Sequence, residues 1–132
     1  MSSKIVLNAR TKENFKIYVR CIQPDYESTI DHPYWNCGYI SIPVQNGKFI
    51  DYDTLSVHGG VTYTNISDDN KYLILGFDTA HLMDSPQYSK SPKSIGYCKN
   101  ELIHLSRQIN KLIITGRKKL IKSKIKLLQM KG

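Results

Sequence analysis

The spacing of apolar residues changes once along this chain, and that change constrains the fold more than any other feature. In the stretch FKIYVRCIQ, residues 15–23, apolar and polar residues alternate, which is the period of a half-buried strand. From Cys98 onward the apolar residues recur at steps of four and three, which is the period of one helical face. The sequence therefore predicts an α+β fold in which the strands precede a long helix.

Four segments carry the strand pattern, and short turn signals separate some of them. The segments are residues 15–23, 37–44, 61–66 and 71–78. Asn46-Gly47 is a strong signal for a tight turn, and the stretch SDDN, residues 67–70, is a second turn. Because connections this short join antiparallel neighbours, we expect one antiparallel sheet.

The helical pattern predicts a long helix that packs on one face of this sheet. Its apolar stripe consists of Cys98, Leu102, Leu105, Ile109 and Leu112. Gly116 marks the expected end of that helix, because glycine is favoured just past a helix terminus. We therefore expect a single α+β domain over residues 1–116, followed by a basic amphipathic helix in residues 117–132.

The charge of the chain lies mostly in that tail. The formal net charge is +8, which invites a nucleic-acid partner, but RKKLIKSKIKLLQMKG after Gly116 holds seven basic residues and no acids. The 12 basic and 11 acidic residues before it leave a charge of only +1 on residues 1–116. The tail can lie on an anionic surface, grip phosphates, or pack at a core or an oligomer interface with its lysines in solvent, and the last alternative is the simplest.

Composition also limits where the protein is expected to work and whether disulfides or zinc stabilise it. No stretch approaches the roughly 18 apolar residues that cross a bilayer, and the N-terminal apolar run is too short for a signal peptide. We therefore expect a cytoplasmic protein without a membrane span. Cys21, Cys37 and Cys98 are widely spaced and form no C-x-x-C pair, so neither a disulfide framework nor a zinc knuckle is expected.

The stretch LSVHGGVTYTN, residues 55–65, is the first of two polar candidates. It places His58 directly before Gly59 and Gly60, which let the backbone turn through positive φ or approach a ligand closely. The simpler interpretation is a turn whose histidine bonds a nearby carbonyl. Taken alone, this stretch favours the simpler interpretation.

The stretch LGFDTAHLMD, residues 75–84, is the second candidate. Asp78, His81 and Asp84 follow a predicted strand at steps of three, so on a helix they would share one face. Asp78 is also suited to cap such a helix. A capping aspartate beside a surface histidine is the simpler interpretation of this stretch.

Together the two stretches predict one polar site at the ends of neighbouring strands. Two histidines and two carboxylates can bind a divalent metal, catalyse proton transfer, or hydrogen-bond a ribose and a phosphate. No H-E-x-x-H, Walker A or G-x-S-x-G motif selects among these. The expected ligand-binding residues are His58, Gly59, Gly60, Thr62, Tyr63, Asp78, His81 and Asp84.

A few further residues have a weaker claim to the site. His32 precedes Pro33-Tyr34-Trp35, a loop that can offer stacking to a ligand or simply pack. Lys16 and Arg20 share the polar side of the strand over residues 15–23 and can supply cations to a phosphate. His104 lies off the apolar stripe of the helix, so we expect it at the surface.

The motifs CGYISIP, VHGGVTY, GFDTAHLMD and CKNELIHLSRQI, in this order, resemble a family of small proteins found in bacteriophage and prophage genomes. The resemblance covers roughly residues 35–110. The basic tail after Gly116 departs from the pattern, because chains of this kind usually stop near the end of the first helix. The resemblance implies a phage origin more directly than it implies a chemistry.

Small phage proteins with one polar pocket often act against host defence, and several defence systems signal with nucleotides. By this analogy we expect a counter-defence protein that sequesters a cyclic dinucleotide or an ADP-ribose-type signal, as a homo-oligomer and without a cofactor. The alternative is a phosphodiesterase in which His58 and His81 act as acid and base or as metal ligands, and Asp78 orients a histidine or binds the metal. A second alternative is nucleic-acid binding through the basic tail.

Overall fold

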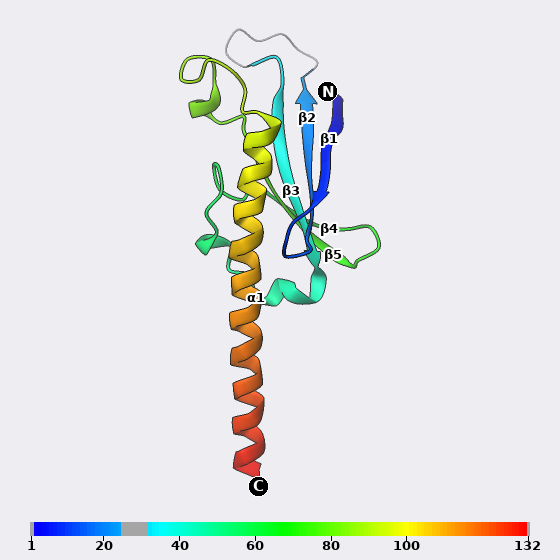
Figure 1. Cartoon of the computed structure of the whole chain (residues 1–132), viewed down its shortest axis with the longest axis vertical. Helices are drawn as coiled ribbons and strands as arrows, with labels where there is room; N and C mark the ends of the chain where they lie inside the picture. Colours follow the sequence, from blue (N-terminus) through cyan, green and yellow to red (C-terminus); the bar gives the residue numbers. More distant parts are fainter. Residues whose placement is uncertain (1, 25–31, 132) are drawn as a thin grey trace.

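The structure, a computed structural model, describes residues 2–24 and 32–131. One face of an antiparallel sheet packs against one long helix, so the predicted α+β architecture is confirmed (Figure 1). The strands lie in the order β1-β2-β3-β5-β4, and every neighbouring pair is antiparallel. The strands are β1 (Ser2–Arg10), β2 (Lys16–Gln23), β3 (Trp35–Pro43), β4 (Tyr63–Ile66) and β5 (Tyr72–Asp78).

The helix is α1 (Ile95–Lys131), and three short 3-10 helices lie in the connections. Two of them follow β3, and the third follows β5. They are η1 (Val44–Phe49), η2 (Tyr52–Thr54) and η3 (Leu82–Asp84).

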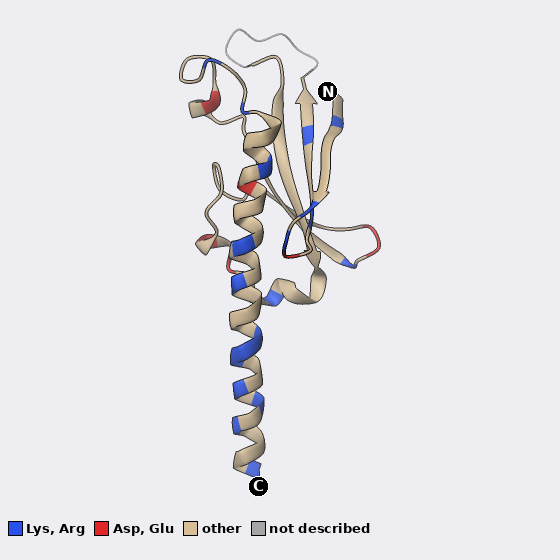
Figure 2. Cartoon of the chain, viewed as in Figure 1, with Lys and Arg blue, Asp and Glu red and all other residues tan. Residues whose placement is uncertain are grey.

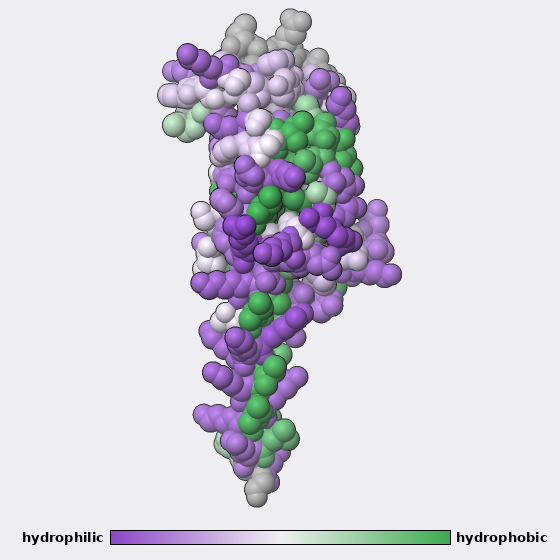
Figure 3. All heavy atoms as spheres, viewed as in Figure 1, coloured by the Kyte–Doolittle hydropathy of each residue, from purple (hydrophilic) through white to green (hydrophobic). Residues whose placement is uncertain are grey.

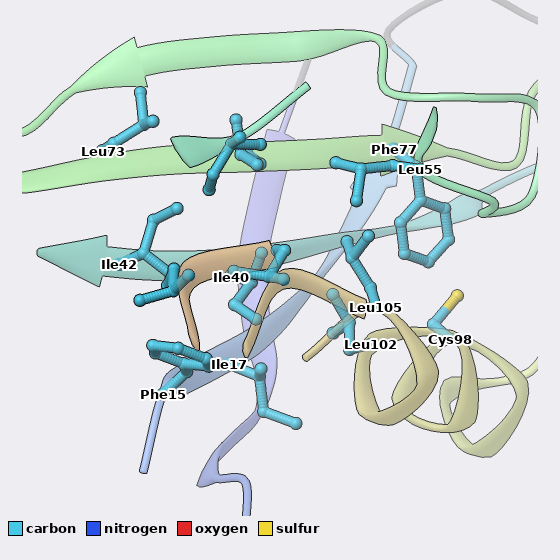
Figure 4. Packing of buried hydrophobic residues seen from close by; sticks show 14 of the residues in the cluster. Phe15, Ile17, Ile40, Ile42, Leu55, Leu73, Phe77, Cys98, Leu102 and Leu105 are labelled. Atoms are coloured by element: carbon cyan, nitrogen blue, oxygen red, sulfur yellow. The ribbon is translucent and has the colours of Figure 1, made fainter. Parts of the chain in front are cut away.

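Strand alternation places the core between the sheet and α1 (Figure 4). The side chains of Ile17 and Val19 on β2, and of Phe15 just before it, are buried, as their spacing predicts. From α1 the buried residues are Cys98, Leu102, Leu105, Ser106, Ile109 and Ile113. The predicted stripe is therefore confirmed except at its end, where Ile113 is buried and Leu112 only partly so.

Gly38 allows the sheet and the helix to come this close. A β-carbon at Gly38 would lie 2.5 Å from a ring carbon of Phe77 and 3.2 Å from a methyl carbon of Leu102. The absence of a side chain on β3 is therefore what admits the Phe77 ring beside α1.

Three features of the fold differ from the sequence-based predictions. Residues 2–10 form β1, an edge strand that the alternation did not reveal, because a register shift between Ile5 and Leu7 interrupts its period. Asn46-Gly47 lies inside η1 rather than in a two-residue hairpin turn. Gly116 does not end the helix: α1 continues to Lys131, and Gly116 instead lies against the ring of Phe49.

The last part of α1 extends beyond the sheet (Figure 1). Lys and Arg recur along this part of the helix, and no Asp or Glu lies among them (Figure 2). Within the described residues, the helix is not long and apolar enough at any point to cross a membrane. The three cysteines are free thiols.

Candidate functional site

Two loops meet over the first turns of α1 and bring the predicted polar residues together. One loop joins η2 to β4 and carries His58, and the other follows β5 and carries His81. The two imidazole rings lie with their centroids 5.9 Å apart. The prediction that these stretches meet is therefore confirmed, whereas the roles of their residues in binding or catalysis stay predictions.

His58 is held on three sides by hydrogen bonds. Its backbone N–H donates to Oε1 of Glu101 at 2.8 Å. Its Nδ1 lies 2.7 Å from the hydroxyl of Tyr97, and its Nε2 lies 2.8 Å from Oδ2 of Asp84. Both ring nitrogens are therefore already occupied by partners within the protein.

The protonation state of Tyr97 assigns the direction of these bonds. Burial, and then the charges of Glu101 and Asp84, raise the pKa of the Tyr97 hydroxyl, so that it keeps its proton. Because a carboxylate only accepts, the tautomer that suits both neighbours donates from Nε2 of His58 to Asp84 and accepts at Nδ1 from the Tyr97 hydroxyl. Hydrogen bonds thus connect Tyr97 to His58 and His58 to Asp84.

Asp84 is the buried centre of the site, with only 3% of its surface exposed. Its Oδ2 accepts from His58 and, at 3.3 Å, from the backbone N–H of His81. Its Oδ1 is also buried and has no hydrogen-bond partner among the described residues. A buried carboxylate oxygen without a donor is costly, so it favours a ligand that supplies an N–H or O–H.

Asp78 connects the second loop to β4. Its Oδ2 accepts from the hydroxyl of Thr62 at 3.0 Å, and its Oδ1 accepts from the N–H of Ala80 at 3.0 Å. Nε2 of His81 lies 3.4 Å from the same Oδ1, within ion-pair distance but not aligned for a hydrogen bond. Asp78 therefore shapes the loop and leaves His81 only weakly engaged.

The two glycines of the first loop have separate roles. Both have positive φ, +67° at Gly59 and +81° at Gly60. A side chain on Gly59 would overlap the imidazole of His81, so glycine is required for the two loops to approach. Gly60 faces open space, and its N–H donates to the carbonyl of Val57 at 2.9 Å, which closes the turn.

Two hollows open on either side of the second loop. One has a volume of about 240 Å³ and is lined by His32, Tyr34, Trp35, Thr79, Ala80, His81, Asp84 and Ser85. The other has about 390 Å³ and is lined by Ile22, Trp35, Cys37, Tyr39, Thr62, Tyr63, Phe77, Asp78 and Ala80. Trp35 and Ala80 line both, so the hollows are neighbours that share one wall.

Several details of the predicted site need correction. Asp78, His81 and Asp84 do not share a helical face: Asp78 ends β5, and only Asp84 lies in a 3-10 helix. They converge because the loop folds back, through the bond from the His81 N–H to Asp84. Tyr63 does not join His58 but lines the second hollow, 5.5 Å from Tyr39 between ring centroids.

The remaining candidates fall into two groups. His32 and Trp35 line the first hollow, whereas His104 is exposed on α1, as expected. Sequence reasoning missed Tyr97 and Glu101 as members of the site. They lie four residues apart, on one side of the first turns of α1, and that spacing was the available signal.

Among residues 2–24 and 32–131, no group of three or more His, Cys, Asp or Glu side chains is arranged to hold a metal ion. In comparisons with protein-family models, curated proteins and solved structures, nothing matches this chain. The case for a function therefore rests on the geometry of the site and on the motif resemblance.

Proposed function

We propose that the protein binds a nucleotide-type phosphorylated small molecule in the two hollows and holds it without cleaving it. In line with the resemblance to phage proteins, the proposed role is a counter-defence protein that sequesters a nucleotide-derived immune signal. The observation that carries the proposal is that His58, bonded at both ring nitrogens, holds Asp84 in the wall of a hollow that Tyr34 and Trp35 also line.

His58 is unsuited to act on a ligand directly. A general base must reach the proton that it removes, but both nitrogens of His58 are bonded to Tyr97 and Asp84. The role that this supports is positioning: His58 fixes the carboxylate of Asp84, which in turn holds the backbone of His81. A rigid, pre-formed pocket favours tight binding because little ordering remains to be done when the ligand arrives.

The hollows offer complementary groups for a nucleotide. Tyr34 and Trp35 supply aromatic surface for a base, and the unpaired Oδ1 of Asp84 accepts from a base N–H or a ribose hydroxyl. The N–H of Gly60 is already used within its turn, so it does not serve a phosphate. A cation lies beside the second hollow, because Arg20 on β2 pairs with Cys37, which lines that hollow.

One observation favours the phosphodiesterase as the second candidate. Nε2 of His81 is buried, lacks a hydrogen-bond partner in the described part of the chain, and lies 3.4 Å from Oδ1 of Asp78. A small rotation of the ring would make an Asp78–His81 pair that is able to move a proton. In that case His81, rather than His58, is the acid–base group.

Sequestration and cleavage are separated by recovering the ligand after binding. Purified protein is mixed with a panel of cyclic dinucleotides and ADP-ribose-derived signals, with and without EDTA, and free ligand is removed. The protein is then denatured by heat, and all fractions are analysed by reversed-phase chromatography. A compound that disappears from solution and returns intact supports sequestration, whereas new products support the phosphodiesterase.

Matched variants then assign the result to this site. Asp84→Asn keeps the shape but weakens the acceptor, and we expect it to reduce ligand capture at least tenfold. His104→Ala, on the exposed side of α1, should capture ligand like the unmodified protein. If a folded protein leaves the whole panel free and unchanged, or if the two variants behave alike, the proposal fails. The expected homo-oligomer is checked in the same samples by light scattering.

A further inference from the structure

The face of the sheet that α1 does not cover carries a row of tyrosines. Tyr18 on β2 pairs with Tyr39 on β3, Tyr39 pairs with Gly76 on β5, and Gly76 pairs with Tyr63 on β4. Directly paired residues share one face, and the neighbours of Tyr18 and of Gly76 along their strands are buried in the core, so all three rings lie on the outer face. We call Tyr18, Tyr39 and Tyr63 the tyrosine row.

The rings of the row contact one another and lie close to the sheet. Tyr18 and Tyr39 stack with centroids 4.9 Å apart and planes within 15°, and Tyr63 meets Tyr39 edge-on at 89°. The fourth position is glycine, and a β-carbon at Gly76 would lie 2.7 Å from Cδ1 of Tyr39. The missing side chain lets the Tyr39 ring lean against β5, and the three rings make one chain of aromatic contacts from β2 to β4.

Cations flank this row on both sides. Lys16 and Arg20 lie two residues from Tyr18 on the same face of β2, and Arg10 pairs with Lys16 from β1. The guanidinium carbon of Arg20 lies 5.9 Å from the centroid of the Tyr18 ring. Among the outer-face positions of the five strands, the acidic residue is Asp78, whose two oxygens already accept from Thr62 and Ala80.

We propose that this open face binds single-stranded nucleic acid, with bases on the tyrosine row and phosphates at Arg10, Lys16 and Arg20. Every base offers a π-face for stacking, and cations beside an aromatic platform follow the phosphodiester backbone. The row crosses three strand spacings, roughly 14 Å, which is room for two or three nucleotides. A duplex hides its base faces inside its own stack, so the surface selects unpaired strands.

This inference goes beyond the proposed function, and the two proposals share one place, because Tyr39 and Tyr63 of the tyrosine row also line the second hollow. The site at His58 and Asp84 takes a small molecule, whereas the tyrosine row is an open surface that accepts a chain. Affinity should therefore rise with oligonucleotide length up to a few nucleotides beyond the row. A mononucleotide should bind the open face weakly.

The test uses the full chain and a fluorescein-labelled twelve-residue oligothymidylate, followed by fluorescence anisotropy at two salt concentrations. We expect Tyr63→Leu to weaken binding at least fivefold, because one stacking contact is lost. Arg20→Gln should weaken binding and reduce its salt dependence. Tyr88→Leu, at an exposed position outside the sheet, is the matched control and should bind normally.

A second set of measurements separates this surface from the basic end of α1. A variant with Lys122, Lys124 and Lys126 replaced by glutamine should keep the response to Tyr63→Leu. Photocrosslinking with a 5-iodouracil oligonucleotide should label peptides that contain Tyr18, Tyr39 or Tyr63, which needs no variant to fold. The proposal would be overturned if the lysine variant lost binding while Tyr63→Leu did not, or if a hairpin duplex bound with equal affinity. Crosslinks confined to α1, or no binding at all, would overturn it as well.

Discussion

The two halves of α1 have the same secondary structure and opposite surroundings. Up to Gly116 the helix buries six residues against the sheet, the last of them Ile113. From Arg117 to Lys131 every residue of the helix is exposed, although apolar side chains continue at helical spacing (Figure 3). The first half carries both charge signs, whereas the second carries seven cations and no acid.

This difference shows that the apolar period of a helix does not by itself indicate burial. Ile114, Ile121 and Leu128 follow one another at steps of seven, yet their side chains are 44%, 56% and 69% exposed. The first half is fixed by tertiary packing, and the second half is helical because its leucines, lysines and glutamine are good helix formers. The two halves should therefore respond differently to the same substitution.

The largest contrast is expected from one leucine in each half. Leu105 is fully buried, so Leu105→Ala should lower the free energy of unfolding by about 3 kcal/mol, through lost burial and the cavity that remains. Leu128→Ala removes a side chain that contacts mainly solvent, and it should change stability by less than about 0.5 kcal/mol. Urea unfolding monitored by the fluorescence of Trp35 measures both.

Equal losses from the two leucines would contradict this division of the helix. They would mean that the second half is covered in solution, for example by another copy of the chain. Repeating the measurement over a tenfold range of protein concentration distinguishes that case, because the stability of an assembly depends on concentration.

High pH should also act through the packed half. Burial, and then the charge of Cys37, raises the pKa of the Cys98 thiol from about 9 to about 12. Above pH 9 the unfolded chain loses this proton while the folded chain keeps it, so stability is complete below pH 9 and falls as pH rises toward 12. Cys98 alone should cost about 2 kcal/mol between pH 9 and 10.5.

Cysteine variants isolate this effect from other alkaline titrations. In urea unfolding at several pH values, Cys98→Ala should flatten the decline by roughly 1.4 kcal/mol per pH unit. Cys21→Ala, which removes a thiol from a half-buried position on β2, is the control. An unchanged slope in Cys98→Ala would show that this thiol is not the group that titrates.

The comparison also explains how much of the fold the sequence revealed. β2 has one buried and one exposed side, so its period of two is visible in FKIYVRCIQ, whereas β5 was predicted from the short apolar run in KYLILGFD. β1 was missed because the irregularity between Ile5 and Leu7 breaks that period. Gly116 was misread as a helix end because the sequence does not show the ring of Phe49 that the glycine accommodates.

The sequence predicted most residues of the candidate site but not how they are arranged. His58, Asp78, His81 and Asp84 stood out because polar side chains beside glycines at strand ends are unusual. The sequence did not indicate that Asp84, rather than a helical face, joins the two histidines, since that depends on how the loop folds back. Tyr97 was hidden because an aromatic residue near a helix start is ordinarily read as packing.

Alanine substitutions at two glycines of α1 test where the packed half of the helix ends. Glycine is a poor helix former, so Gly→Ala usually stabilises a helix by up to about 1 kcal/mol. At Gly96 the nearest atom to a new β-carbon is 3.9 Å away, and we expect a gain of about 0.5 kcal/mol. At Gly116 the new β-carbon meets the Phe49 ring, and a net loss of about 1 kcal/mol is expected in thermal unfolding.

If Gly96→Ala and Gly116→Ala both stabilised the protein, the packed half of α1 would not extend to Gly116. That outcome would place the Phe49 ring away from Gly116 in solution. The packed half would then end earlier, near Ile113.

The smallest effect is expected within the exposed half, from lysines that repel one another. Lys118, Lys122 and Lys126 are spaced four apart and so lie on one side of the helix. Lys122→Gln removes three like-charge pairs at once, with Lys118, Lys119 and Lys126, and each is worth about 0.2–0.5 kcal/mol. Lys124→Gln is the matched control, because the residues three and four positions away from Lys124 are all apolar.

Hydrogen exchange of the amides in residues 117–131 reports on this half without unfolding the domain. Exchange in Lys122→Gln should slow by about threefold at low salt and return to the rate of the unmodified protein at high salt, because salt screens exposed charges. Lys124→Gln should leave the rate unchanged. If both variants slow exchange equally, the total charge of the exposed half matters and the lysine spacing does not. If neither variant slows exchange, an anionic partner has already neutralised the lysines of the exposed half.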